Sequence, residues 1–459
     1  MSSRTAPPWP LVALFTAGYL AAYLLPTTVG RLDAGLPLSA TEAGSIGSAL
    51  LLSSAAAGFL LAAHVHRVGP RRLARTGLLL AAAGYGTAAV SHSIPVVVAG
   101  AVVGGFGSGT ATTVAATGIA ALGAPPARAE SRAWGSDPHG ASTLGLLGVS
   151  ALAGAFYLTI PHLGPGHGLP LAAIALTALL VWPATGRLSS PAPVATAPRE
   201  TGRLPHCGAG LVLAGGILCW SLAQNSLWGV SGRIGLSQAH LSEVTVGLVF
   251  AVALGAGLLG VIGASMLGSR LGRALPVGVG TALIAGCIAL SASATGLGTF
   301  ATGEIAWNTL YPIVLSYLIG LAASLDRRGR WAVLVGSASS LGTAAGPLTG
   351  SVLAARAGFP AMGTILAAGL LAIALPLAAV ARQPGGRPLL RGGVRRRQGV
   401  QATVVAVSTG GAMGAIAPAD TSEQPVVEIP FDTTAAADQG AYGTAGPRQT
   451  TAASGPGTP

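Results

Sequence analysis

Long apolar segments recur along most of this chain, and they constrain its fold more than any other feature. Each is about 20 residues long, and polar or arginine-bearing stretches separate them. A helix of about 20 apolar residues spans the roughly 30 Å hydrocarbon core of a bilayer. The pattern predicts about twelve transmembrane helices, over residues 9–29, 43–63, 73–90, 95–122, 140–160, 169–183, 207–229, 243–264, 275–292, 299–325, 331–355 and 360–381.

The composition excludes a soluble protein of this size. Only 8% of the residues are charged and 51% are hydrophobic, whereas soluble domains carry roughly 25% charged residues. The 69 glycines fit a bundle whose helices pack closely, because small residues let helix backbones approach each other in lipid. We therefore predict an all-α membrane protein that forms a helix bundle.

The arginines predict how the chain is oriented. With the N-terminus inside, 22 of the 25 basic residues fall in inner segments, and the outer loops hold only Arg31, Arg233 and Arg356. Such a bias marks the cytoplasmic side. The net charge of +12 is thus an orientation signal and indicates no nucleic-acid partner. We expect a multi-pass protein of the cytoplasmic membrane with both termini in the cytoplasm.

The two parts of the chain repeat at an offset of about 200 residues. The sequence GRL at 30–32 returns as GRI at 232–234, RVG at 67–69 as RLG at 270–272, and ASTLG at 141–145 as ASSLG at 338–342. Two repeated six-helix halves are one arrangement of secondary transporters. We predict an N-terminal half (1–186), a cytoplasmic linker (187–206), a C-terminal half (207–381) and a disordered cytoplasmic tail (382–459), whose composition cannot bury a core.

Basic turns after the second and eighth predicted helices carry a family resemblance. The first has Arg67, Gly69, Arg71 and Arg72, and the second has Arg270, Gly272 and Arg273. These turns resemble motif A of the major facilitator superfamily, with His66 in place of the aspartate of that motif. The resemblance implies conformational roles for these residues.

Two glycine-rich helices extend the resemblance. Gly105-Phe106-Gly107 is similar to the end of motif B, and the predicted eleventh helix resembles motif C through Gly342, Gly346, Pro347 and Gly350. The sequence thus resembles twelve-helix major facilitator transporters over residues 9–381. The resemblance implies two pseudo-symmetric six-helix bundles, a central cavity lined by helices one, four, seven and ten, and alternating access.

Polar and aromatic residues follow a helical spacing on three of these four helices. The spacing i, i+3, i+4, i+7 puts them on one face, and amides and phenols are unfavourable toward lipid. We expect them to bind substrate or protons; the alternative is interhelical hydrogen bonding alone. They are Tyr19 and Tyr23; Gln224, Asn225 and Trp228; and Glu304, Trp307, Asn308 and Tyr311.

Apart from Glu243 at the first position of its segment, Glu304 is the one acidic residue inside a predicted spanning helix, and the one arginine inside such a helix is Arg75, near the end of its segment. A carboxylate in hydrocarbon is costly unless it is paired, hydrated or protonated, so it is a functional hypothesis by default. We expect Glu304 to couple protons or substrate. The alternatives are hydrogen bonding near the outer interface and direct binding of a cationic substrate.

The chain holds no Walker loop, no metal-ligand spacing and no catalytic constellation. We therefore expect no enzyme, cofactor or metal, but a monomeric secondary active transporter of a small organic molecule. Protons are the expected drive, and efflux is one expected direction. An uncoupled facilitator, an uptake symporter and a non-transporting membrane sensor remain alternatives.

Overall fold

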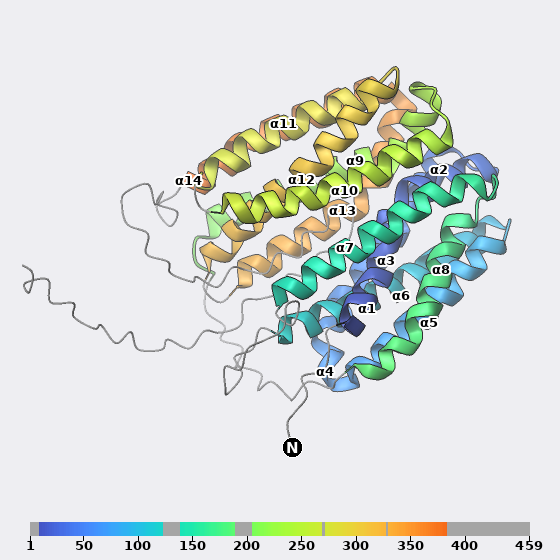
Figure 1. Ribbon diagram of the computed structural model, residues 1–459. Coiled ribbons are helices and arrows are strands. Elements are labelled where there is room, and N and C mark those ends of the chain that lie inside the picture. Colours follow the sequence, from blue (N-terminus) through green and yellow to red (C-terminus); the bar gives the residue numbers. More distant parts are fainter. Residues whose placement is uncertain (1–8, 123–137, 189–203, 269–270, 327–328, 383–459) are drawn as a thin grey trace, which may run out of the picture. The chain divides into compact units, whose positions relative to one another are not determined.

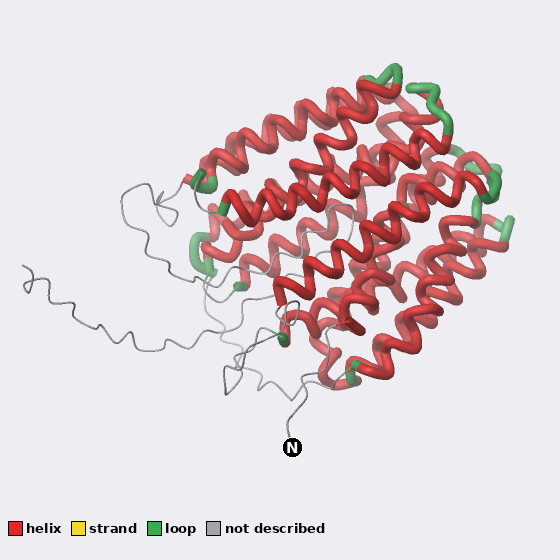
Figure 2. Tube along the Cα trace, viewed as in Figure 1, coloured by secondary structure: helices red, strands yellow, loops and turns green. Residues whose placement is uncertain are grey.

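The computed structural model describes residues 9–122, 138–188, 204–268, 271–326 and 329–382. Within these ranges the chain forms helices and loops and no strand (Figure 2). The long helices, coloured along the sequence in Figure 1, are α1 (Trp9–Tyr23), α2 (Leu25–Gly35), α3 (Ala40–Leu61), α5 (Pro70–Val90), α6 (Ile94–Ala121), α7 (Pro138–Thr159), α8 (Leu169–Val181), α9 (Cys207–Arg233), α10 (Glu243–Leu267), α11 (Ala274–Ala292), α12 (Leu297–Leu325), α13 (Arg330–Ala357) and α14 (Phe359–Arg382).

Short helical turns extend some of these helices. They are η1 (Ala62–His64) and α4 (Val65–Val68) after α3, η2 (Ile160–His162) after α7, η3 (Trp182–Arg187) after α8, and the π-helical η4 (Ile234–Gln238) after α9. The predicted tail falls almost wholly outside the described residues, as does most of the predicted linker.

Every apolar segment of the sequence coincides with a helix. Ten helices in the described ranges are long and apolar enough to cross a membrane, and α1 and α2 form an eleventh span if the pair is counted as one. The remaining predicted segment, residues 331–355, corresponds to α13, which has 28 residues but carries many Ser, Thr and Gly. The all-α fold class is thereby confirmed. The division into two six-helix halves stays a prediction.

The first span differs from the prediction at its end. Residues 9–29 were expected to form one helix with a loop behind it, but α1 stops at Tyr23 and α2 continues to Gly35 after a bend of 46°. Pro26 lies at the start of α2, and a proline cannot donate the hydrogen bond that would continue α1. Arg31 is consequently a buried helical residue and not a loop residue.

Close backbone contacts explain the glycine content. A Cβ on Gly84 of α5 would lie 2.3 Å from the backbone nitrogen of Gly104 on α6. On α13, a Cβ on Gly342 or Gly350 would lie 2.2 Å from a backbone oxygen of α9. These pairs pack at distances that only glycine permits.

Three helix pairs make most of the contacts between the two predicted halves in the described ranges. α3 packs on α13, α7 on α10, and α2 on α9. A Cβ on Gly44 of α3 would lie 2.8 Å from the carbonyl oxygen of Pro347 on α13. The backbone nitrogen of Leu348 donates to Ser48 Oγ at 2.9 Å across the same contact.

Candidate functional site

The polar and aromatic residues of α9 and α12 meet along one contact between these helices. Trp307 Nε1 donates to Gln224 Oε1, and the rings of Trp307 and Trp228 lie 5.6 Å apart. One turn further along, Trp220 stacks on Tyr311 at 4.9 Å. All five side chains are buried. We call them, together with Glu304 and Asn308, the α9–α12 stripe.

Glu304 lies at one end of the stripe and is 0% exposed. Its Oε1 accepts hydrogen bonds from Ser231 Oγ on α9 at 2.9 Å and from Ser291 Oγ on α11 at 2.6 Å. Its Oε2 has no hydrogen-bond partner among the described residues. The carboxyl group thus lies between α9, α11 and α12, and two hydroxyl donors hold one of its oxygens.

Asn225, which is not part of the stripe, and Asn308, which is, donate no hydrogen bond to a side chain of the stripe. Asn225 Nδ2 donates to the backbone oxygen of Ser221 at 2.8 Å and to Thr343 Oγ1 on α13 at 3.2 Å. Asn308 Nδ2 donates to the backbone oxygen of Glu304 at 3.0 Å. The structure therefore joins Asn225 to α13, while Asn308 bonds within α12.

The tyrosines of α1 lie against the same region. Tyr19 and Tyr23 are buried, and the ring of Tyr19 contacts Phe15 at 4.4 Å. Trp228 Nε1 donates to the backbone oxygen of Ala22 at 3.2 Å, so the chain of α1 closes one side of the stripe. Tyr157 Oη on α7 donates to the backbone oxygen of Tyr23 at 2.5 Å.

Buried polar atoms without a protein partner gather on these helices. They number ten in the described part of the chain, and six belong to α9 and α12: Trp220 Nε1, Gln224 Nε2, Asn225 Oδ1, Arg233 Nε, Glu304 Oε2 and Asn308 Oδ1. A buried polar group without a hydrogen bond costs roughly 1–3 kcal/mol and calls for an explanation. Water or a bound ligand would satisfy these atoms.

The two motif A-like turns share a backbone geometry. Gly69 has a φ of 96° before α5, and Gly272 has a φ of 68° before α11. Side chains other than glycine rarely adopt such angles, so both turns require the glycine that the resemblance identified. Arg273 is the N-cap residue of α11, whereas Arg270 lies outside the described residues.

The arginines of the first turn differ in their contacts. Arg71 Nε donates to the backbone oxygen of Leu188 and so ties the start of α5 to the segment after α8. Arg67 and Arg72 are exposed. Arg75, one turn further, bonds Thr185 Oγ1 at 3.2 Å and lies 5.4 Å over the Trp182 ring.

The motif C-like residues form the face of α13 that packs on α9. A Cβ on Gly346 would lie 2.5 Å from Asn225 Cβ, and Pro347 lies beside Gly229 of α9 and Gly47 of α3. Gly342 and Gly350 flank this contact one turn away on either side. These residues position α13 between α9 and α3, a structural role.

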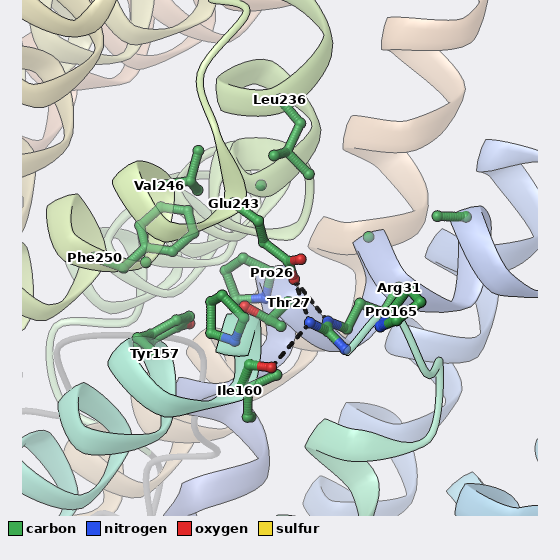
Figure 3. Close-up of a pocket in the computed structure, with 15 residues that line it drawn as sticks. Pro26, Thr27, Arg31, Tyr157, Ile160, Pro165, Leu236, Glu243, Val246 and Phe250 are labelled. Atoms are coloured by element: carbon green, nitrogen blue, oxygen red, sulfur yellow. Dashed lines mark hydrogen bonds and ion pairs between the residues drawn. The ribbon is translucent and has the colours of Figure 1, made fainter. Parts of the chain in front are cut away.

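A charged contact that the sequence did not indicate joins α2 to α10. Arg31 contacts Glu243 Oε1 through Nε and Nη2, both at 2.7 Å. Its Nη1 donates to the backbone oxygens of Gly164 and Gly166, and its Nη2 to that of Ile160 at 3.3 Å. Figure 3 shows the guanidinium pointing between Glu243 and Ile160. We call this contact the Arg31 clasp.

A cavity of about 130 Å³ lies beside the Arg31 clasp, with apolar walls from α2, α7, α9 and α10 (Figure 3). Tyr157 and Phe250 line it, with ring centroids 5.1 Å apart. The Phe250 ring also lies 5.3 Å from Trp228 of the stripe. This pair of rings separates the cavity from the stripe.

The repeat-related arginine makes a second contact between the predicted halves. Arg233, which matches Arg31 in the sequence repeat, lies 3.8 Å from Asp33 on α2 and donates to Ser351 Oγ on α13 at 2.8 Å. Each predicted half thus contributes one arginine to an ion pair with the other half.

Some residues of the site were not predicted. Ser231 follows Trp228 by three residues, so the helical spacing already contained the signal for it. Ser291 and Glu243 come from other helices and show no sequence pattern that links them to Glu304 or Arg31. Their roles appear only when the helices pack.

No family model matches this chain, and no curated protein matches it. Its fold is similar to the crystal structure of the human organic anion transporter MFSD10 (TETRAN), with a TM-score of 0.55 and 18% sequence identity over 82% of this chain and 100% of that one. The chain therefore has the fold of major facilitator superfamily transporters, as the motifs implied. At this identity the likeness concerns the fold.

Proposed function

We propose that this protein is a secondary transporter that moves a small organic molecule across a cytoplasmic membrane by alternating access. The buried α9–α12 stripe with its unpartnered polar atoms carries the proposal, on a fold that transporters use. In such folds the substrate site lies near the bilayer midplane, and the halves rock around it. The sequence holds no nucleotide-binding loop, so an ion gradient is the drive.

Glu304 is the residue we assign to proton coupling. Its carboxyl group is fully buried, and the partners of its Oε1 are neutral hydroxyls. Burial away from a cation disfavours the charged form, so the group gains and loses a proton as its surroundings open to water and close. The motif C-like face on α13 supports no particular direction of transport.

The experiment is transport by purified protein in liposomes. A panel of small organic solutes is screened for uptake that requires the protein, with empty liposomes as the control. The proposal predicts protein-dependent movement of at least one solute with saturation kinetics. A chain that inserts and folds but moves no solute of a broad panel would favour a non-transporting sensor.

A further inference from the structure

The unpartnered atoms of the α9–α12 stripe have a chemistry that selects among substrates. Glu304 Oε2 and Asn308 Oδ1 are acceptors, whereas Gln224 Nε2 and Trp220 Nε1 are donors. All four side chains are at most 1% exposed. A substrate that satisfies them needs a hydrogen-bond donor or a positive charge for Glu304, and an apolar surface for the surrounding rings.

Among the described residues, the groups that surround Glu304 supply no positive charge. Its hydrogen-bond donors are Ser231 and Ser291, and Tyr157 and Cys287 lie within electrostatic range. Arg233, two residues beyond Ser231, points to Ser351 and Asp33 instead. An anionic substrate would add like charge beside an ionised carboxyl group, whereas a cation would neutralise it.

The rings of the stripe favour the same charge. Trp307, Trp228, Trp220 and Tyr311 present four aromatic faces between Glu304 and the far end of the stripe. Such faces attract cations, and tryptophan does so most strongly. The rings contact each other in this structure, so a ligand enters only when α9 and α12 separate. Both helices belong to the predicted C-terminal half, so this separation is a rearrangement within that half that accompanies the rocking of the two halves.

We propose that the α9–α12 stripe binds an organic cation, meaning an apolar or aromatic body that carries a protonated amine or a quaternary ammonium group. This inference rests on the proposed transport function and names its substrate class. The class differs from the organic anions named for the structural neighbour. The Glu304 carboxylate can either carry a proton or pair with the bound cation, but not both. Binding of the cation therefore releases the proton to water.

Binding to detergent-solubilised full-length protein tests this inference without requiring transport. Radiolabelled phenyltrimethylammonium and tetraphenylphosphonium are the probes, and benzenesulfonate and tetraphenylborate are anionic competitors of matched size. We expect at least one cation to bind saturably and unlabelled cations to displace it, whereas the anions do not. Equal displacement by the anions, or the absence of saturable cation binding, would overturn the inference.

Two substitutions locate the binding. Glu304→Gln keeps the size of the side chain and removes its charge, and we expect roughly tenfold or greater weakening of cation binding. Glu42→Gln is the matched control, because Glu42 is exposed at the start of α3 and glutamine preserves its capping box. Unchanged affinity in Glu304→Gln would contradict the assignment.

If gel filtration shows that Glu304→Gln is misfolded, a third substitution tests the site in its place. Trp307→Phe keeps an aromatic ring, but it removes the Nε1 donor and weakens the cation–π attraction, so cation affinity falls. Cation affinity equal to that of the unmodified protein would then contradict the assignment of the cation site to the stripe.

Liposomes that transport a solute while the protein binds anions would leave the transport proposal standing and overturn only the cation inference. Cation binding that depends on Glu304, in a protein that moves none of the solutes, would overturn transport and leave the site.

Discussion

Single glycines set the distance between α9 and α13. A Cβ on Gly350 would lie 2.2 Å from the backbone oxygen of Ser226, and a backbone atom in a packed helix cannot move aside as a flexible side chain can. By contrast, a Cβ on Gly215, which lies on α9 as Ser226 does, meets nothing within 4 Å. The chain therefore offers a matched pair of glycines, one in the contact and one outside it.

We predict that Gly350→Ala lowers the free energy of unfolding by about 1–3 kcal/mol, since overpacking forces the helices apart. Thermal unfolding in detergent, followed by intrinsic tryptophan fluorescence, measures the change. Gly215→Ala should leave the unfolding temperature the same or slightly higher, because alanine is the better helix former. Equal unfolding temperatures for the two variants would mean that α13 does not depend on this close contact.

The sequence predicted the stripe better than it predicted the partners of each residue. Helical spacing put Gln224 and Trp307 on the inward faces of two helices, and the structure joins them by a hydrogen bond. Asn225 fits the same spacing but bonds to Thr343 on α13. A periodicity of 3.6 residues gives a face about 100° wide, and it does not say which of two neighbouring helices a residue at its edge will contact.

At the scale of helices, the Arg31 clasp stabilises the arrangement in which the ends of α2 and α10 meet. The Arg31 side chain is 7% exposed and that of Glu243 is 36% exposed. Water reaches Glu243 and screens the pair, which limits its contribution to about 1 kcal/mol. The bonds from Arg31 to backbone oxygens are independent of that charge.

We predict that Glu243→Gln shifts the population away from this arrangement by roughly fivefold, the equivalent of about 1 kcal/mol. Spin labels at the exposed residues Pro37 and Val244, in a background with the three cysteines replaced, report the distance between the two helix ends by pulsed electron paramagnetic resonance. The longer-distance component should grow in Glu243→Gln and not in Glu42→Gln. An unchanged distribution would show that the carbonyl contacts of Arg31 suffice.

Helix limits were the weaker part of the sequence prediction. The segment predicted over residues 43–63 begins at Ala40 in the structure, where Ser39 and Glu42 form a capping box. The continuation of α2 to Gly35 was missed because Gly30 and the charged residues after it suggest a loop. Contacts from other helices, above all those of Arg31, satisfy these polar groups and allow the helix to continue.

The whole molecule has a predicted orientation that follows from its arginines. We expect a reporter that is active only outside the cytoplasm to be silent when fused at Ser190, which lies outside the described residues, and active when fused at Leu36. Activity at Ser190 would overturn the orientation, and with it the assignment of the Arg31 clasp to the outer side of the membrane.

For the whole protein, the central proposal is proton-coupled transport through Glu304. Its most direct test imposes a pH gradient on liposomes that contain the protein and a solute it moves. We predict that the unmodified protein and Glu42→Gln accumulate the solute above equilibrium. Glu304→Gln should accumulate none, because its side chain cannot carry a proton, and exchange at saturating solute confirms that it is folded. Accumulation by Glu304→Gln at the rate and pH dependence of the unmodified protein would contradict the account.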